Sequence, residues 1–371
     1  MKKNTVAIIT LYGEYNIGNK LQHFAVEQIY KDIGLNVISF WYELSEQESV
    51  GNKTSKVKEF IKALMSLVGI NVRSIRLYNL EKKRNAKFKN FSQNYLSLGP
   101  QIIDFVITNQ LANKYDFYSV GSDQVWRNWT GTIKELEYFL LAKINPEKRI
   151  CLSPSIGRES LPNNYIDIYI NELSKFKYLS CREVSGSSLI GDATGRYVET
   201  LVDPTMAIDS NKWISIEKKP EFEVPSKYIL VYFLGDKDIK ATMKIKQIAE
   251  DERMPIIDIY NKEEYPIYYT CSPDEFLYLV NKASLICTNS FHGTVFSILF
   301  NRDFIYFERD DKRANMTDRV RTLLKTFDLE ERIYQTGKNY SSNIDFGIAN
   351  NKIKNERERL YEFVRMSVNS K

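Results

Sequence analysis

Residues 288–297 read Thr-Asn-Ser-Phe-His-Gly-Thr-Val-Phe-Ser, a polar segment enclosed by two apolar runs. The preceding residues 283–287 have the composition of a buried strand, and residues 295–300 are apolar enough for a buried helix. This order places the polar segment at the carboxyl end of a strand, the edge at which open α/β sheets bind their ligands. His292 lies at this turn and is one of only two histidines in the chain. We therefore expect any imidazole chemistry to occur here.

The pattern of strand, loop and helix continues in both directions from this segment. Residues 6–11 form a continuous apolar run typical of a buried parallel strand, and a helix is expected over about residues 20–33. A second series of the same kind opens at residue 228. The expected fold class is therefore α/β, with two doubly wound Rossmann-like domains facing a cleft.

The expected domain boundaries follow from composition. The amino-terminal domain covers residues 1–210 and carries a helical insertion at about residues 45–100. Residues 206–227 contain prolines and charges and are the best candidate for a linker. The carboxyl-terminal domain covers residues 226–345, and a last helix within residues 346–371 is expected to pack back on the first domain.

Polar motifs also follow other predicted strands. They are Tyr15-Asn16-Ile17-Gly18-Asn19-Lys20-Leu21-Gln22, Gly121-Ser122-Asp123-Gln124-Val125-Trp126, Ser180-Cys181-Arg182-Glu183 and Val202-Asp203-Pro204-Thr205. Together with Ser290-Phe291-His292-Gly293 they resemble, in the same order, the motifs of the polysaccharide pyruvyl transferase family.

The resemblance implies a fold similar to that of glycosyltransferase-B enzymes. It also implies transfer of the enolpyruvyl group of phosphoenolpyruvate to two hydroxyls of a sugar in a surface-polysaccharide precursor. The product would be a pyruvate ketal, with release of phosphate. Phosphoenolpyruvate and a saccharide acceptor, free or lipid-linked, are the expected partners, and no metal or nucleotide cofactor is required.

Two residues are expected to be catalytic. His292 is the best acid/base, because only histidine titrates near neutral pH without a large perturbation. Arg182 is the choice for bidentate capture of the donor carboxylate or phosphate. The expected substrate-binding residues line the same loops; they are Asn16, Gly18, Asn19, Ser122, Asp123, Gln124, Ser290, Gly293 and Thr294. The main-chain N–H groups of Gly293 and Thr294, with the Ser290 hydroxyl, are expected to cradle phosphate.

Structural interpretations compete with some of these roles. Arg182 fits an ion pair with Glu183 or another acid equally well, and Asp123 fits a helix cap. Asp203 with its following proline is interpreted as a structural turn, and His23 as a packing or surface residue.

The sequence departs from the family pattern at three points. One is Leu152-Ser153-Pro154-Ser155-Ile156-Gly157, where the family has a pattern of small and aromatic residues before Phe-Gly, so the acceptor side is expected to differ. Several members have an arginine where this chain has Ser290, so a donor cation must come from elsewhere, and the candidates are Arg302, Arg309, Arg313 and Arg319. Many relatives carry an aspartate at the position of Asn19, so a carboxylate base is absent there.

Composition narrows the function classes. The chain carries 52 Lys and Arg against 47 Asp and Glu, a balance that gives little support to nucleic-acid binding. The four cysteines are scattered and lack the spacing of a zinc site, which favours reduced core residues and a cytoplasmic protein. The apolar run at the amino terminus is too short for a signal peptide, and no run approaches the length of a membrane span.

Two questions stay open at this level. Lysines and aromatic residues between positions 53 and 91 fit either a helix that lies on the inner face of an anionic membrane or, as we favour, the solvated face of a core helix. A nucleotide-sugar glycosyltransferase and a catalytically silent sugar-binding protein are the alternative functions.

Overall fold

The computed structural model describes residues 3–13, 16–45, 72–235, 238–309, 314–338, 340 and 344–369. Its strands form a five-stranded sheet of order β3-β2-β1-β4-β5, a four-stranded sheet of order β11-β10-β8-β9 and a short pair β6-β7, all parallel. The strands are β1 Thr5–Ile9, β2 Asn36–Glu43, β3 Leu98–Ile103, β4 Phe117–Val120, β5 Arg149–Cys151, β6 Ser180–Cys181, β7 Glu199–Thr200, β8 Ile229–Tyr232, β9 Ile256–Asp258, β10 Leu285–Thr288 and β11 Phe304–Tyr306.

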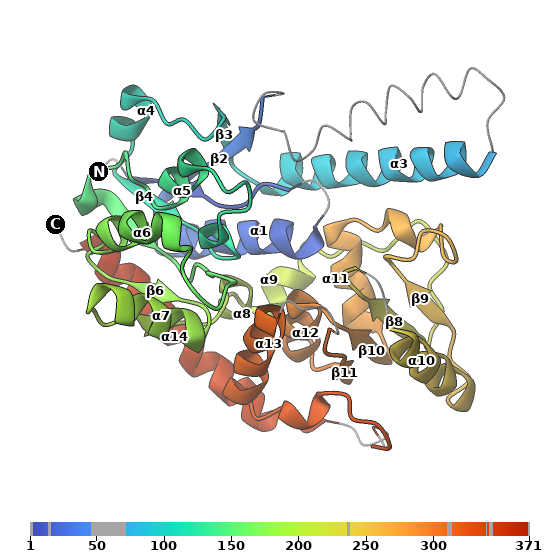
Figure 1. Cartoon of the computed structure of the whole chain (residues 1–371). Helices are drawn as coiled ribbons and strands as arrows, with labels where there is room; N and C mark the ends of the chain where they lie inside the picture. Colours follow the sequence, from blue (N-terminus) through green and yellow to red (C-terminus); the bar gives the residue numbers. More distant parts are fainter. Residues whose placement is uncertain are drawn as a thin grey trace.

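Helices cover these sheets (Figure 1). They are α1 Ile17–Asp32, α3 Val72–Tyr95, α4 Asn109–Lys114, α5 Ile133–Phe139, α6 Ile166–Leu173, α7 Val184–Thr194, α8 Pro204–Ala207, α9 Ser210–Ile214, α10 Ile239–Asp251, α11 Pro273–Lys282, α12 Phe291–Leu299, α13 Ala314–Thr326 and α14 Gly347–Asn369. The alternation of strand and helix confirms the expected α/β class with two Rossmann-like parallel sheets.

The register of the first sheet brings two motif loops together. Strand β1 lies at the centre, and its apolar residues are buried because helices pack on both faces of a parallel sheet. Ile9 lies opposite Val120 of β4, so the chain leaves both strands at the same edge. The loop before α1 and the loop that begins at Gly121 are therefore neighbours.

The second sheet repeats this arrangement around β10. Thr288 lies opposite Tyr232 of β8 and Tyr306 of β11. The segments that follow these three strands consequently form one edge, and the His292 segment is in its centre. Helix α12 begins directly there, at Phe291, so His292 belongs to its first turn rather than to a loop before it.

One apolar core joins the two halves. Trp213 of α9 packs against Phe24 of α1 and Phe296 of α12, with ring centroids 5.3 Å and 4.9 Å apart. The segment 206–227 was expected to be a linker, and that interpretation is wrong for its first part, because Trp213 is fully buried in this core.

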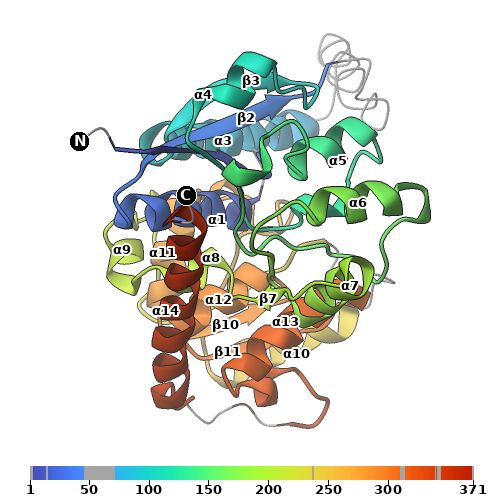
Figure 2. The ribbon, with the colours of Figure 1, turned by 90° about the vertical axis from the view of Figure 1, so that its left-hand side faces the viewer.

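Helix α14 runs from the second half of the molecule back to the first (Figures 1 and 2). Near its start Lys352 pairs with Asp328, and near its end the Tyr361 hydroxyl donates a hydrogen bond of 2.7 Å to Asp32 of α1. Arg359 reaches Glu199 of β7. The last helix thus packs on the amino-terminal half.

The region expected to be a helical insertion, at about residues 45–100, contains both a helix and a strand of the first sheet. Residues 46–71 lie outside the described part of the chain, α3 is helical, and Leu98–Ile103 forms the edge strand β3. Phe88 and Phe91 of α3 are buried, and Lys87 binds Glu275 of α11 at 2.6 Å. The described part of this region is therefore a core helix with an edge strand.

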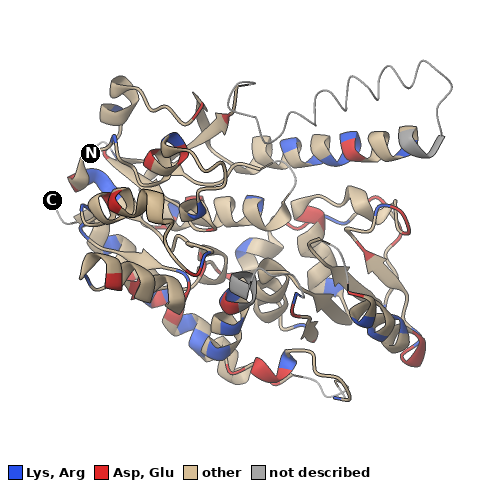
Figure 3. Cartoon of the chain, viewed as in Figure 1, with Lys and Arg blue, Asp and Glu red and all other residues tan. Residues whose placement is uncertain are grey.

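Acidic and basic side chains are interspersed on the surface helices (Figure 3). On α13 and α14 several of them form pairs, such as Arg321 with Glu308 at 2.7 Å and Arg359 with Glu356 at 2.8 Å. Within the described residues, no helix combines the length and the apolar character needed to cross a membrane. All four cysteines are buried as free thiols.

Candidate active site

A cavity of about 1200 Å³ is lined by residues of both halves. Its walls are the segments that leave the carboxyl ends of β1 and β4 in the first sheet and of β8, β10 and β11 in the second. This is the edge at which the sequence predicts a ligand. Of the expected site residues, Asn16, Asn19, Asp123, Gln124, Ser290 and His292 line the cavity.

His292 is placed by the first turn of α12. Ser290 caps the helix, its Oγ accepting a hydrogen bond of 3.4 Å from the Gly293 main-chain N–H. The imidazole is 7% exposed, and its Nε2 lies 3.9 Å from Asp203 Oδ2. Burial lowers the pKa of His292 below its usual value, although Asp203 and Asp123 act in the opposite direction. The imidazole is therefore neutral near pH 7 and can accept a proton.

Gly18 has a steric role beside this histidine. A Cβ atom on Gly18 would lie 2.1 Å from His292 Nδ1, so only glycine lets α1 approach the imidazole this closely. Gly18 does not line the cavity, so the structure does not place it among the substrate-binding residues as expected; it packs against His292 instead.

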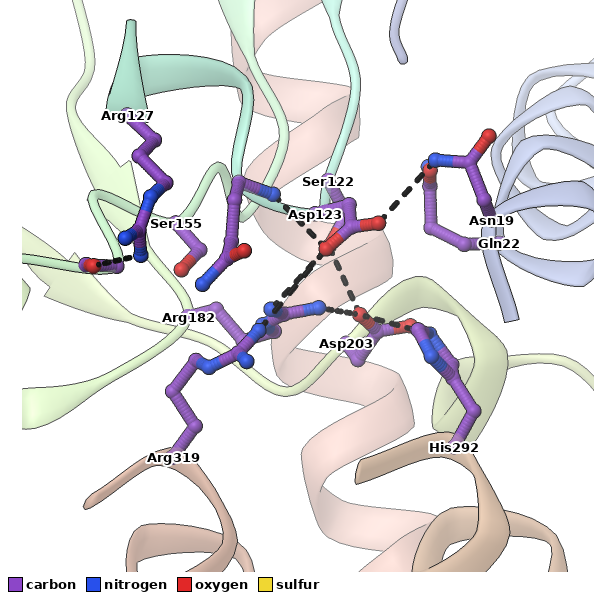
Figure 4. A network of polar contacts seen from close by, with 12 residues as sticks. Asn19, Gln22, Ser122, Asp123, Arg127, Ser155, Arg182, Asp203, His292 and Arg319 are labelled. Carbon is purple, nitrogen blue, oxygen red and sulfur yellow. Dashed lines mark hydrogen bonds and ion pairs between the residues drawn. The ribbon is translucent and has the colours of Figure 1, made fainter. Parts of the chain in front are cut away.

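Asp203 connects His292 to the first half of the molecule. Its Oδ2 accepts hydrogen bonds from Ser122 Oγ at 2.9 Å and from Arg182 Nη1 at 2.5 Å, while its Oδ1 caps α8 through Thr205 (Figure 4). Burial opposes ionisation of Asp203, but Arg182 and His292 outweigh it and lower its pKa to about 2. The interpretation as a turn is correct but incomplete, because the carboxylate also belongs to the site.

Arg182 does not line the cavity. Its guanidinium is buried, binds Asp203, lies 3.6 Å from Asp123 and stacks on the Phe291 ring with 4.4 Å to the centroid. The expected capture of the donor by Arg182 does not fit this placement. The competing interpretation, a structural ion pair, describes the geometry, with Asp203 as the partner rather than Glu183.

Asp123 occupies the centre of the network in Figure 4. Its backbone has a φ of +66°, in the left-handed region, which aspartate adopts more readily than most residues other than glycine. Oδ1 accepts the Gln124 main-chain N–H at 2.9 Å, and Oδ2 accepts Asn19 Nδ2 at 3.2 Å. Burial opposes ionisation, but Arg182 and then His292 and Arg319 lower the pKa of Asp123. The carboxylate is therefore charged where it meets the cavity.

The two asparagines of the first motif have positioning contacts. Asn16 caps α1 by accepting the Asn19 main-chain N–H at 3.2 Å. The Asn19 amide accepts from Gly13 and donates to Asp123, so an aspartate at this position would repel Asp123. Asn19 thus connects the first motif loop to Asp123.

The expected phosphate cradle on α12 is not available. The Gly293 N–H is bound to Ser290 Oγ, and the Thr294 N–H is bound to the Ser290 carbonyl at 3.1 Å. A Cβ atom on Gly293 would lie 2.3 Å from Thr288 Oγ1, so this glycine permits packing of the helix on β10. Ser122, likewise, binds Asp203 and is fully buried.

Among the four arginines considered as a substitute cation, Arg319 has the required position. It lines the cavity and its Nη1 lies 3.9 Å from Asp123 Oδ1. Burial, followed by the positive charge of Arg182, lowers its pKa to about 10. Arg309 also lines the cavity, Arg302 binds Asn281, and Arg313 lies outside the described residues.

Sequence reasoning did not select Trp129 or Glu135, which line the cavity on the wall of the first half. Both follow the Gly121–Trp126 motif closely in the sequence, and this closeness is the signal by which they could have been selected as site residues. Within the described residues, no group of three or more His, Cys, Asp and Glu side chains has the geometry of a metal site.

The profile of the polysaccharide pyruvyl transferase family matches residues 16–311, which include Asp123, Arg182, Asp203 and His292. The chain belongs to this family. Family membership identifies it as a transferase that acts on polysaccharide, and implies a saccharide acceptor. Arg319 lies beyond the matched segment, although its side chain meets Asp123 in the same cavity.

Several solved structures of enzymes whose names refer to sugars resemble this chain at low sequence identity. An alpha-glucosyltransferase in complex with UDP and DNA has a TM-score of 0.44 and 10% identity, over 98% of this chain and 95% of its own. A putative UDP-N-acetylglucosamine 2-epimerase from Listeria monocytogenes has a TM-score of 0.47 and 9% identity, over 100% and 98%. The UDP-GlcNAc 2-epimerase from Methanocaldococcus jannaschii has a TM-score of 0.41 and 12% identity, over 98% and 93%. No curated protein matches the sequence.

Proposed function

We propose that the chain transfers the enolpyruvyl group of phosphoenolpyruvate to two hydroxyls of a saccharide in a surface-polysaccharide precursor, in the cytoplasm. The observation that carries the proposal is that the buried His292 lines one cavity together with the Asp123 carboxylate and the Arg319 guanidinium, which lie 3.9 Å apart. The family supplies the class of reaction, and these three side chains supply a base, an orienting carboxylate and a cation for the donor.

The donor binds on the side of the second half, where the cations that line the cavity are found. They are Lys240, Arg309 and Arg319. Phosphoenolpyruvate carries a phosphate and a carboxylate, so it needs cations and hydrogen-bond donors. Burial and Arg182 disfavour the charged form of Arg319, and an anion in the cavity relieves this because it stabilises the guanidinium. Arg319 thus takes the role that the sequence assigned to Arg182.

His292 serves as the base for the acceptor. It removes the proton of the first sugar hydroxyl, whose oxygen forms a bond to carbon 2 of the donor while carbon 3 gains a proton. The bond between carbon 2 and the phosphate oxygen then breaks, and the oxygen of the second hydroxyl forms the second bond of the ketal. One hydroxyl proton ends on carbon 3 and the other on the released phosphate, so atoms and charges balance.

Isothermal titration calorimetry with phosphoenolpyruvate tests the donor assignment. Arg319→Met is expected to weaken binding by about 10- to 100-fold, the size of a lost hydrogen bond between charged groups. Lys325→Met is the matched control, because Lys325 is an exposed cation on the same helix α13 and does not line the cavity.

Two results would contradict the donor assignment. One is the absence of any phosphoenolpyruvate binding by the wild-type protein, and the other is equal affinity in the Arg319→Met variant. Binding of a nucleotide sugar in place of phosphoenolpyruvate would support the alternative function of a glycosyltransferase.

A further inference from the structure

Trp129 presents an open aromatic surface to the cavity. Its side chain is 51% exposed and lines the cavity wall of the first half, whereas Trp126 and Trp213 are fully buried. A ligand that covered the ring would remove this apolar surface from water, which is favourable. The indole is therefore a candidate ligand contact that the donor assignment does not use.

The position of this indole is fixed before any ligand binds. The Trp129 main-chain N–H donates to Glu135 Oε1 at 2.9 Å, and the Thr130 hydroxyl donates to Glu135 Oε2 at 2.6 Å. Glu135 is only 2% exposed, and both of its carboxylate oxygens accept hydrogen bonds from this loop. The indole N–H donates to the Gln124 carbonyl at 3.2 Å, and the Arg127 guanidinium lies 4.5 Å from the ring centroid.

Arg127 is itself anchored. Its Nη1 donates a hydrogen bond of 2.7 Å to the Gly157 carbonyl (Figure 4), which holds the cation against the indole. A ring fixed by a hydrogen bond, a cation contact and a buried carboxylate loses little conformational entropy when a ligand stacks on it.

The groups that the first half contributes favour a ligand with hydroxyls. Gln124 and Asp123 line the cavity from this half and offer an amide and a carboxylate, whereas Lys240, Arg309 and Arg319 come from the second half, with Arg319 lying 3.9 Å from Asp123. The face of an aromatic ring carries partial negative charge and attracts the slightly positive C–H groups of an apolar surface. A pyranose has such a C–H surface, and its hydroxyls hydrogen-bond to amides and carboxylates.

We propose that Trp129 is the stacking platform for a pyranose of the saccharide acceptor, which places the acceptor hydroxyls toward Gln124, Asp123 and His292. The inference rests on the proposed function, since it assigns the acceptor to one wall and the donor to the other. Trp129 determines acceptor affinity and has no part in donor binding.

Fluorescence titration with a panel of methyl glycosides and disaccharides of galactose, mannose, glucose and N-acetylglucosamine provides the test. Trp129 is the one tryptophan among the described residues that lines the cavity, and it is 51% exposed. A saccharide that binds there should therefore change the indole emission. In Trp129→Ala this change should disappear and saccharide affinity, measured by calorimetry, should fall at least about tenfold. Trp129→Phe should retain part of the affinity. Phosphoenolpyruvate affinity should be unchanged in both variants.

Tyr197→Ala is the matched control, because Tyr197 is an aromatic side chain that is 83% exposed and does not line the cavity. Undiminished saccharide affinity in Trp129→Ala, or no binding of any panel member by the wild-type protein, would overturn the proposal. Saccharide binding through Trp129 without phosphoenolpyruvate binding would support the platform and contradict the proposed donor. A failure of the acceptor platform can therefore be distinguished from a failure of the donor assignment.

Discussion

Asp203 illustrates how single side chains organise this site. One of its oxygens receives Ser122 and Arg182, and the same oxygen lies 3.9 Å from His292. Arg182 and Asp203 are both buried, and Asp203 accepts further hydrogen bonds from Ser122 and Thr205, which help to offset the cost of burying the ion pair. We conclude that Arg182 positions Asp203, and that Asp203 in turn sets the electrostatics of His292.

The titration of His292 should respond to Asp123. His292 has a lowered pKa, and the charge of Asp123 partly offsets that lowering. Asp123→Asn removes the charge and keeps a residue type that tolerates positive φ, so the pKa of His292 should fall further. The Cε1–H signals of protein with ¹³C-labelled histidine, of which there are two in the chain, report this directly in an NMR titration.

The other histidine serves as an internal reference in this titration. Burial lowers the pKa of His23 to about 4, and His23 lies in the interior on α1. A His292 signal that titrates above pH 6.5, or that does not move in Asp123→Asn, would contradict the electrostatic account.

Gly18→Ala should impair both activity and stability. The new Cβ would collide with the His292 ring at 2.1 Å and displace it, and overpacking of a buried site costs about 1–3 kcal/mol of stability. We expect at least a tenfold loss of activity together with a lower melting temperature. Activity assays and circular dichroism melting measure the two effects, and full activity of the variant would refute the steric role of Gly18.

Helix α3 shows how one element links parts that are distant in sequence. Lys87 binds Glu275, which is fully buried in the first turn of α11 and also accepts the Ser272 main-chain N–H. Lys83, one turn earlier on α3, binds Glu221 on the surface. Two ion pairs on the same helix therefore differ chiefly in burial.

Their contributions to stability should differ accordingly. Lys87→Met leaves the buried Glu275 carboxylate without its cation and should reduce the free energy of unfolding by roughly 1–3 kcal/mol. Lys83→Met removes an exposed pair and should change it by less than about 0.5 kcal/mol. Urea denaturation of both variants provides the measurement. Equal effects would show that burial of Glu275 is not the decisive factor.

Local sequence signals predicted the elements better than they predicted the contacts. The Ser272–Glu275 capping box and the helix that ends at Lys282 can be predicted from the local sequence, because the box depends only on neighbours within one turn. The strand before His292 also depends on a local apolar run. In contrast, the buried pairing of Arg182 requires Asp203, which the fold brings close only when β6, α8 and the β4 loop pack together.

Arg319 and Trp129 show the same limit for the site. Arg319 was one of four candidate cations, and no local pattern distinguishes a helix residue that reaches Asp123 from one that faces solvent. Trp129 follows a motif but has no periodic signal of its own. The direction in which a side chain points across a cavity depends on how the elements pack, so it cannot be predicted from the spacing of residues in the sequence.

At the scale of the whole molecule, the cavity is held by a shared core rather than by a flexible connection. Phe24, Trp213 and Phe296 pack together in tilted and edge-to-face contacts from three helices that belong to both halves, and α14 contacts both halves as well. The cations that line the cavity, Lys240, Arg309 and Arg319, come from the second half, whereas Asp123, Gln124 and Trp129 come from the first. His292 belongs to the second half and meets Asp123 and Asp203 of the first.

The most direct test of the proposed pyruvyl transfer is release of inorganic phosphate from phosphoenolpyruvate, measured with and without a panel of galactosides, mannosides and glucosides. We predict release that depends on an acceptor and that falls at least about 100-fold in His292→Ala, since a positioned base contributes about 10²–10⁴-fold to rate. Acceptor-independent release, release that His292→Ala retains, or no release with any acceptor would contradict the proposed reaction.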